Sequence, residues 1–431
     1  MSLSYDPASQ VTQILHQLTA TSTQINKADY LYNPVGNRTS LTDRRGAQAF
    51  GYDNLDRLTN ASHPLLATPQ AFAYDAVGNR TTGGSVVNAG NQLTADATHS
   101  YQYDDNGNLT RKTLLVTGTF TAYTYDAESR LTKVEEFAAG NPTAIATSTY
   151  RYDGLGRRIE KVANGQTKRY VYDGEDILLE YDGANVLQAR YTHGPGIDEP
   201  LAVTKGSATF FYHQDGLGTV TDLTDATGVT AKSYAYDSYG NILESPGTLD
   251  QPYTYTGREF DSESGLYFLR MRTYDPLSGR FDQKDPYEFN GGQLNLYQYN
   301  YNEPLDFTDP FGGIPKGLSK PVDPFKAPLW IAKACVQRVV STVSADGKSQ
   351  GWIGNDKRMH CAVSCVAAKK CGTPAALGGG LGREFKQLFL QGKIFNWQQG
   401  ILDSYRDEAA NIYGITCPLN EDCYQRCTAK Y

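Results

Sequence analysis

Two aspartates, Asp285 and Asp309, each precede a proline in a tyrosine-rich segment that contains no cysteine. They stand 24 residues apart, so only folding can bring them together. Two adjacent carboxyl groups cannot both ionise cheaply, and a shared proton lets one act as a base on a water molecule while the other protonates an amide. A guanidinium such as that of Arg272 can hold one carboxylate ionised or polarise a carbonyl. The alternative interpretation is that both aspartates only form turns that end strands.

A second group of reactive side chains is confined to residues 314–431. All seven cysteines of the chain lie there, and six are candidates for disulfide bonds: Cys361, Cys365, Cys371, Cys417, Cys423 and Cys427. The motifs CAVSC and CYQRC have an i, i+4 spacing, which places each cysteine pair on one face of a helix. Two facing helices could be joined by two disulfides, with Cys371 and Cys417 as a third and Cys335 unpaired, although the connectivity is open. This usage indicates an oxidising compartment.

Zinc is the alternative for these cysteines, because C-x3-C beside His360 has a ligand-like spacing. Zinc sites, however, lie more often on turns than on two helices, and free thiols are a third possibility. We therefore expect disulfides rather than a metal centre, and no cofactor.

Candidates for toxin chemistry in residues 314–431 are few: His360, the only histidine of the segment, and the carboxylates Glu384, Asp403 and Asp407. A packing histidine and a solvated helix face are the bland interpretations of the same residues. The stretch EFKQLFLQGKIFNW is basic and aromatic, which suits an anionic membrane surface, and an ordinary core-facing helix is its alternative. Because no HxH or HNH cluster is present, a nuclease is unconvincing, and nucleic acid is an unlikely partner.

Charge changes at the same place as cysteine content. The whole chain carries a net charge of −7, but residues 314–431 hold 16 Lys and Arg against 9 Asp and Glu, which leaves −14 on residues 1–313. An acidic body with a basic C-terminal piece indicates mutual attraction or an anionic target of that piece, and two solvated surfaces are the alternative. No signal peptide and no apolar stretch long enough for a membrane span are recognised.

The elements that must position these side chains are repeats. Tyrosines of similar motifs, such as GYDNLDRLTN and RYDGLGRRIEKV, recur every 20–29 residues at Tyr32, Tyr52, Tyr74, Tyr103, Tyr125, Tyr152 and Tyr172. A period of this size is typical of a repeat architecture. Each unit predicts a strand, an Asp-x-x-Gly turn and a second strand. Stacked hairpins predict one long curling sheet with no chemistry assigned to the repeat residues.

These units resemble the YD repeats of the Rhs family, which also includes the C subunits of Tc toxins and the YD shell of teneurins. The segment RTYDPLSGRFDQKDPYEFNGGQLNLYQYNYNEPLDFTDPFGG, residues 272–313, is similar to the Rhs-associated core domain. The resemblance implies a mainly β fold, a spiral of hairpins that partly encloses a cargo. It divides the chain into a YD shell at 1–250, the core domain at 251–313 and a variable, α-rich, cysteine-rich toxin at 314–431.

The resemblance also implies self-cleavage of the aspartic-protease type. The matching residues are Arg272, Asp285 and Asp309, and the bond to be cut is Gly313–Ile314. The family usually has leucine where this chain has Gly313, and loss of that apolar anchor could loosen the bond in its pocket.

On this basis the chain resembles an effector of interbacterial competition, made in the cytoplasm and delivered into target cells by a machine such as type VI secretion. Expected partners are a cognate immunity protein, a secretion component or chaperone, and, for a toxin acting from the periplasm, the target-cell membrane. A pore-forming toxin in place of an enzymatic one, and a non-toxic surface or carbohydrate-binding YD protein, are the alternatives. The change of cysteine content and charge after Gly313 argues against the last.

Overall fold

The computed structural model describes residues 1–317. The chain separates into two compact units, Met1–Pro321 and Val322–Tyr431, and the described residues belong to the first. Within the described residues, antiparallel strands dominate and the helical elements are short 3₁₀ turns, as the mainly β prediction requires. The domain bounds 1–250, 251–313 and 314–431 stay predictions, and the α-rich character of the last lies outside the described residues.

Two long sheets follow the chain strand by strand. The first has seven strands: β1 (Ser2–Tyr5), β2 (Val11–Leu18), β3 (Thr23–Tyr32), β4 (Arg38–Asp43), β5 (Gly46–Tyr52), β6 (Leu58–Ala61) and β7 (Gln70–Ala71). The second has fifteen: β8 (Val86–Val87), β9 (Leu93–Ala95), β10 (His99–Tyr103), β11 (Leu109–Leu114), β12 (Phe120–Tyr125), β13 (Leu131–Phe137), β14 (Ala144–Tyr152), β15 (Arg158–Ala163), β16 (Gln166–Asp173), β17 (Asp176–Asp182), β18 (Leu187–His193), β19 (Pro200–Lys205), β20 (Ala208–Gln214), β21 (Val220–Thr224) and β22 (Thr230–Ser233).

Smaller elements follow the repeats. They are β23 (Ala235–Tyr236), β24 (Ile242–Glu244), β25 (Glu259–Asp261), β26 (Leu266–Leu269), β27 (Arg272–Asp275), β28 (Arg280–Phe281), β29 (Phe307–Thr308) and β30 (Lys316–Gly317), with 3₁₀ turns η1 (Tyr255–Gly257), η2 (Glu288–Gly291) and η3 (Asn300–Asn302). The strands β25–β28 form a four-stranded sheet, whereas β23–β24 and β29–β30 are separate pairs.

The repeat motif builds each hairpin through one aspartate and one tyrosine. In the unit at Asp153, the carboxylate Oδ1 accepts the backbone N–H groups of Leu155 and Arg157 at 2.9 and 3.0 Å, which closes the turn. The hydroxyl of Tyr152 donates to the carbonyl of Leu131 in the preceding unit at 2.6 Å. The tyrosines at the same position of other units repeat this link: Tyr32, Tyr52, Tyr74, Tyr125, Tyr172 and Tyr236. These residues therefore build the sheet, as predicted.

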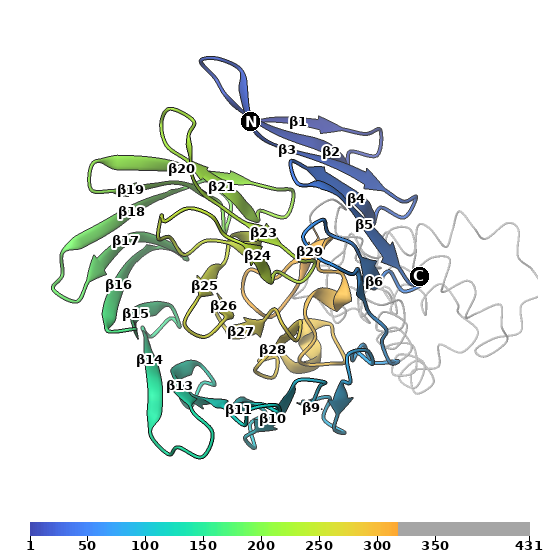
Figure 1. Cartoon of the computed structure of the whole chain (residues 1–431), viewed down its shortest axis with the longest axis vertical. Coiled ribbons are helices and arrows are strands. Elements are labelled where there is room, and N and C mark those ends of the chain that lie inside the picture. Colours follow the sequence, from blue (N-terminus) through green and yellow to red (C-terminus); the bar gives the residue numbers. More distant parts are fainter. Residues whose placement is uncertain (318–431) are drawn as a thin grey trace, which may run out of the picture. The chain divides into compact units, whose positions relative to one another are not determined.

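The second sheet curves around the small sheet β25–β28 (Figure 1). Its buried side chains pack against residues from the later part of the chain, such as Tyr253 and Leu266. Ion pairs tie the two parts together, for example Lys112 to Asp275 at 2.7 Å. The inside of the curl is thus filled by the chain's own residues that follow the repeats.

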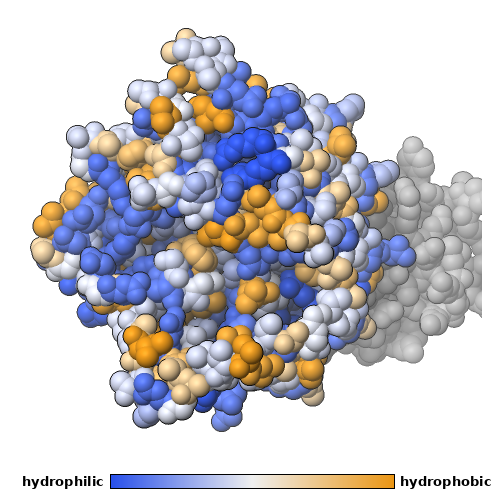
Figure 2. All heavy atoms as spheres, in the orientation of Figure 1, coloured by the Kyte–Doolittle hydropathy of each residue, from blue (hydrophilic) through white to orange (hydrophobic). Residues whose placement is uncertain are grey.

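Outside this core, the surface is mixed. On the face drawn in Figure 2, apolar side chains form separate groups among polar ones. Within residues 1–317, no helix is long and apolar enough to cross a membrane, and no group of three or more His, Cys, Asp or Glu side chains is arranged to hold a metal ion.

Candidate active site

The first residue of β27, Arg272, brings the two aspartates named in the sequence analysis together. Its Nη2 lies 3.1 Å from Oδ2 of Asp285 and 3.7 Å from Oδ2 of Asp309. All three side chains are almost completely buried. The guanidinium also donates from Nη1 to the carbonyl of Leu296 at 3.0 Å and lies over the ring of Phe281, 3.5 Å from its centroid. Both contacts fix its plane between the carboxylates.

The two aspartates reach this point from different loops. Asp285 follows β28 and accepts the backbone N–H of Tyr287 at 2.8 Å, so its loop closes on its own carboxylate. Asp309 follows β29, and its Oδ1 accepts the backbone N–H of Gly313 at 2.9 Å. The pairing of β29 with β30 closes the loop that holds residues 309–315. Lys316–Gly317 is thus a strand.

Burial raises the pKa of both carboxyl groups. For Asp285 burial is the largest influence, opposed by the charge of Arg272, while the charge of Asp309 raises the pKa further. For Asp309 burial again raises the pKa, whereas Arg272 and the backbone N–H groups of Gly313, Gly312 and Ile314 lower it. Burial also lowers the pKa of Arg272. Opposed influences of this kind let a carboxyl pair divide into one acid and one base.

Residues 310–312 are hydrogen-bonded to residues 270–272, one carbonyl to each residue. Arg270 donates from Nη1 to the carbonyl of Pro310, and the backbone N–H of Met271 donates to the carbonyl of Phe311 at 3.1 Å. Arg272 donates from Nε to the carbonyl of Gly312 at 2.5 Å. Three consecutive carbonyls are therefore fixed, which presents the next peptide bond, Gly313–Ile314, in one orientation.

The carbonyl of Gly313 and the carboxylate of Asp285 face the same small volume beside Gly291. A Cβ atom built on Gly291 would lie 2.8 Å from Oδ2 of Asp285 and 3.1 Å from the carbonyl oxygen of Gly313. Both oxygens therefore lie close to the backbone of Gly291, which places the Asp285 carboxylate near the carbonyl of the proposed cleavage site. The nitrogen of the same peptide bond, in Ile314, lies on the side of Asp309.

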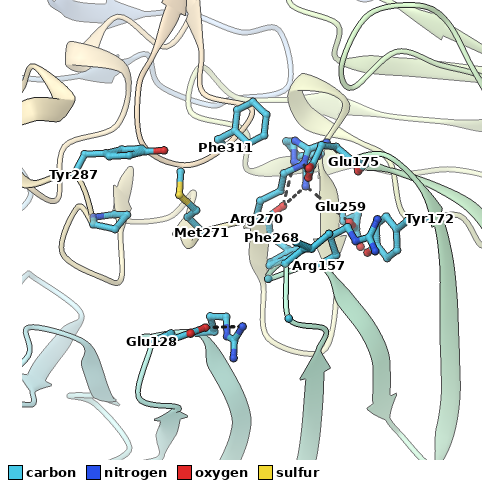
Figure 3. A pocket seen from close by; sticks show the side chains of 16 residues that line it. Glu128, Arg157, Tyr172, Glu175, Glu259, Phe268, Arg270, Met271, Tyr287 and Phe311 are labelled. Atoms are coloured by element: carbon cyan, nitrogen blue, oxygen red, sulfur yellow. Dashed lines mark hydrogen bonds and ion pairs between the residues drawn. The ribbon is translucent and has the colours of Figure 1, made fainter.

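A cavity of about 420 Å³ adjoins this segment (Figure 3). Five of its lining residues come from the site itself: Arg270, Met271, Pro286, Tyr287 and Phe311. The remainder comes from the repeats, for example Glu128 and Arg157, and from residues after them, for example Phe268.

The structure thus brings Arg272, Asp285, Asp309 and Gly313 together, with Ile314 half exposed beside them. Their catalytic roles stay predictions. Sequence reasoning missed Arg270, Met271, Tyr287 and Gly291. Only the Gly291-Gly292 pair in the core motif carried a signal, because glycine marks close approach. The remaining candidates lie outside the described residues: His360, Cys361, Cys365, Cys371, Glu384, Asp403, Asp407, Cys417, Cys423 and Cys427.

Comparison with known proteins decides the family. A model of the teneurin YD-shell matches residues 1–305. The chain belongs to the teneurin YD-shell family. The resemblance to Rhs and YD-repeat proteins is thereby confirmed.

Curated relatives of this YD-shell chain carry names of toxins and nucleases. The tRNA3(Ser)-specific nuclease WapA of Bacillus spizizenii is 36% identical over 280 residues, which are 61% of this chain and 12% of that protein. The double-stranded DNA deaminase toxin A of Burkholderia cenocepacia is 30% identical over 324 residues, 66% of this chain and 22% of the relative. The chain spans less than a quarter of either relative.

A solved structure shares the YD-shell fold. The Tc holotoxin pore of Photorhabdus luminescens matches with a TM-score of 0.51 and 19% identity, over 73% of this chain and 18% of that chain. At this identity the likeness concerns the fold alone.

Proposed function

We propose that this chain is a YD shell of the Rhs type that carries a toxin in residues 314–431 and releases it by cutting its own Gly313–Ile314 bond. The arrangement of Arg272 between Asp285 and Asp309, at 3.1 and 3.7 Å, beside that peptide carries the proposal. Two relatives, the tRNA nuclease WapA and the double-stranded DNA deaminase toxin, support the toxin part.

In the proposed reaction, Asp285 is the base. Its carboxylate is the one closer to the Arg272 guanidinium, which favours the ionised form, and its Oδ2 faces the Gly313 carbonyl. Ionised Asp285 takes a proton from a water molecule, whose oxygen attacks the carbonyl carbon of Gly313.

Asp309 is the acid of the same reaction. Its Oδ2 is buried without a hydrogen-bond partner among the described residues, and burial raises its pKa, so a proton there is retained. As the tetrahedral intermediate collapses, this proton passes to the nitrogen of Ile314. The products are a shell ending in a Gly313 carboxylate and a cargo beginning with an Ile314 amine.

Arg272 positions the reacting groups. Its bonds to the carbonyls of Gly312 and Leu296 hold the guanidinium against both carboxylates. Its positive charge also offsets the negative charge that develops on the intermediate, the usual role of a preorganised cation.

The self-cleavage test compares four chains made by cell-free synthesis: wild type, Asp285→Asn, Asp309→Asn and Asp282→Asn. An amide can neither accept the water proton nor donate to nitrogen, so we expect the first two variants to stay intact while the wild type divides. Asp282 is a matched control, because it is a buried carboxyl of the same region whose pKa burial raises well above its usual value.

Cleavage of Asp282→Asn at the wild-type rate, beside intact Asp285→Asn and Asp309→Asn chains, supports the proposal. Denaturing gel electrophoresis measures the cleaved fraction of each chain over time. Equal cleavage of all four chains would show that neither Asp285 nor Asp309 takes part in the reaction.

The proposed toxin is tested with the full chain expressed in bacteria, with or without an added export signal. The matched control is a chain that stops at Gly313. We expect growth arrest only with residues 314–431 present, and rescue by a dedicated immunity protein supplied in the same cell. Arrest confined to the exported form, with loss of membrane potential, would support the membrane-acting alternative, and normal growth in both compartments would contradict a toxin.

A further inference from the structure

Gly313, the residue before the proposed cut, has no room for a side chain. A Cβ atom built on it would lie 2.7 Å from Cε2 of Tyr287 and 2.9 Å from Cε of Met271, closer than real Cβ atoms come. Its backbone is not in the left-handed region, so the need for glycine comes from these neighbours.

Gly313 cannot move away from the two side chains, because hydrogen bonds hold both its own N–H group and the carbonyl of the preceding residue. Arg272 holds the Gly312 carbonyl, and Asp309 holds the Gly313 N–H at 2.9 Å. Met271 takes part twice, since its backbone N–H holds the carbonyl of Phe311 at 3.1 Å while its methyl group packs on Gly313.

Space for a larger side chain lies directly behind this barrier. Tyr287 and Met271 both line the cavity of about 420 Å³, together with Pro286 and Phe311. In Figure 3 the ring of Tyr287 and the side chain of Met271 lie side by side, with Phe311 close by. This wall is apolar, and the cavity exceeds the volume of a leucine side chain.

The Tyr287 ring is not a core residue that the fold requires. It is 45% exposed, whereas the backbone N–H of the same residue makes the bond to Asp285. Removal of the ring therefore leaves the contact with the carboxylate in place.

We propose that Tyr287 and Met271 set the specificity of self-cleavage: they occupy the position of the side chain that precedes the cut bond, so this site accepts only glycine there. The proposal rests on the proposed self-cleavage. Tyr287 is the main determinant, because its ring carries the two nearest atoms, and Met271 completes the barrier.

The test is a double-mutant cycle on the full chain, with Gly313→Leu, Tyr287→Ala and both together, each made by cell-free synthesis. We expect Gly313→Leu to cleave slower than wild type by roughly tenfold to a hundredfold, because the larger side chain pushes the Gly313–Ile314 peptide bond away from the two carboxylates. In the double variant, Tyr287→Ala should restore most of the lost cleavage rate, because the leucine side chain can then enter the cavity. The matched control is Leu155→Ala, which trims a cavity residue from a repeat turn and should not rescue Gly313→Leu.

A second readout does not need cleavage. In the uncleavable Asp309→Asn chain, Gly313→Leu should lower the melting temperature of the shell, and Tyr287→Ala should reverse most of that decrease. If the wild type stays intact, the proposed self-cleavage fails, and the melting temperatures alone decide whether Tyr287 closes the cavity. Equal cleavage of wild type and Gly313→Leu, additive melting shifts, or rescue by Leu155→Ala would overturn the assignment.

Discussion

At the scale of single residues, the site depends on the missing side chain of Gly291 as well as on its charged groups. Gly291 allows the Asp285 carboxylate and the Gly313 carbonyl to come close to its backbone, because it carries no Cβ atom. A methyl group there would lie 2.8 Å from Oδ2 of Asp285 and 3.1 Å from the carbonyl oxygen of Gly313, so one of the two groups would have to move.

We therefore predict that Gly291→Ala abolishes or strongly slows self-cleavage while the shell still folds. The reason is the 2.8 Å approach of the new Cβ to Oδ2 of Asp285. Cleaved fraction and melting temperature are measured on the same sample. Gly154→Ala is the matched control, because a Cβ there meets nothing within 4 Å. Unchanged cleavage of Gly291→Ala would show that this close approach of carboxylate and carbonyl is not needed.

Some residues of the candidate site could be predicted from the sequence and others could not. Arg272, Asp285 and Asp309 could be named because they stand at matched places in a long ordered motif, and the structure does bring them together. Tyr287 and Met271 could not be named, because their contact with Gly313 depends on how three loops meet. Composition and periodicity carry no signal for such a contact.

At the scale of elements, the repeat hairpin joins its neighbour through one hydroxyl group. The Tyr152 hydroxyl reaches the carbonyl of Leu131, the first residue of β13, across the edge of its own hairpin. The pairing register shifts at this motif. In the pair β14–β15, for example, it shifts between Arg151 and Tyr152, next to the turn. The shift is a bulge that increases the local twist, which suits a sheet that curls.

We predict that Tyr152→Phe lowers the free energy of unfolding of the shell by about 1 kcal/mol, the usual net value of one hydrogen bond. Urea denaturation of the uncleavable Asp309→Asn chain measures it. Tyr5→Phe, at a tyrosine that is 57% exposed, is the control and should cost less. If both changes cost the same, the hydroxyl link would contribute nothing specific.

The hairpins themselves followed from the sequence, because a Tyr-Asp motif every 20–29 residues combines a strand residue with a turn residue. The bulge and the hydroxyl link did not, because each depends on the register between strands.

At the scale of the whole described unit, the first sheet meets the second along a polar seam. His16 of β2 and His213 of β20 lie with their Nδ1 atoms 3.2 Å apart. Nε2 of His16 bonds to the carbonyl of Gln214, and Nε2 of His213 to the hydroxyl of Thr224. Two neutral rings satisfy this chain of bonds, whereas two protonated rings would set N–H against N–H.

Charged groups flank the seam as well. Asp222 of β21 accepts from Arg44 at 2.6 Å and from Asn26 at 2.7 Å, and burial raises its pKa. Burial is the largest influence that lowers the pKa of both histidines, and the charge of His16 lowers that of His213 further. Asp222 is therefore already paired with Arg44, and the histidine pair is kept neutral by its burial.

We predict that acid opens this seam. Burial lowers the pKa of His213 from 6.5 to about 4, and that of His16 in the same direction. A lowered pKa in the folded state stabilises the seam above pH 6.5, and this contribution is lost as the pH falls toward 4. Hydrogen exchange of β2 and β20, expressed relative to the rate of an unprotected amide at the same pH, should therefore rise as the pH falls between these values.

The control for the seam is a His213→Gln chain, which keeps hydrogen-bonding groups but does not titrate. Its hydrogen exchange in β2 and β20 should change less over the same pH range. The same rise in both chains would exclude the histidine pair as its cause.

The contact between the two sheets at the seam could not be predicted from the period of the repeats. The repeat pattern specifies pairing between consecutive strands, whereas the seam joins residues nearly two hundred positions apart, such as Asn26 and Thr221. Nor did the pattern indicate that residues after the repeats fill the curl, because that depends on the size of the cavity a curved sheet leaves.

Intact mass spectrometry of the purified protein shows whether the shell cuts its own chain between Gly313 and Ile314. Self-cleavage predicts two wild-type fragments whose masses correspond to residues 1–313 and 314–431, and a single uncleaved species for Asp309→Asn. A single uncleaved wild-type species of 47.4 kDa, or fragments that meet at an Asp-Pro bond instead, would contradict cleavage at this site.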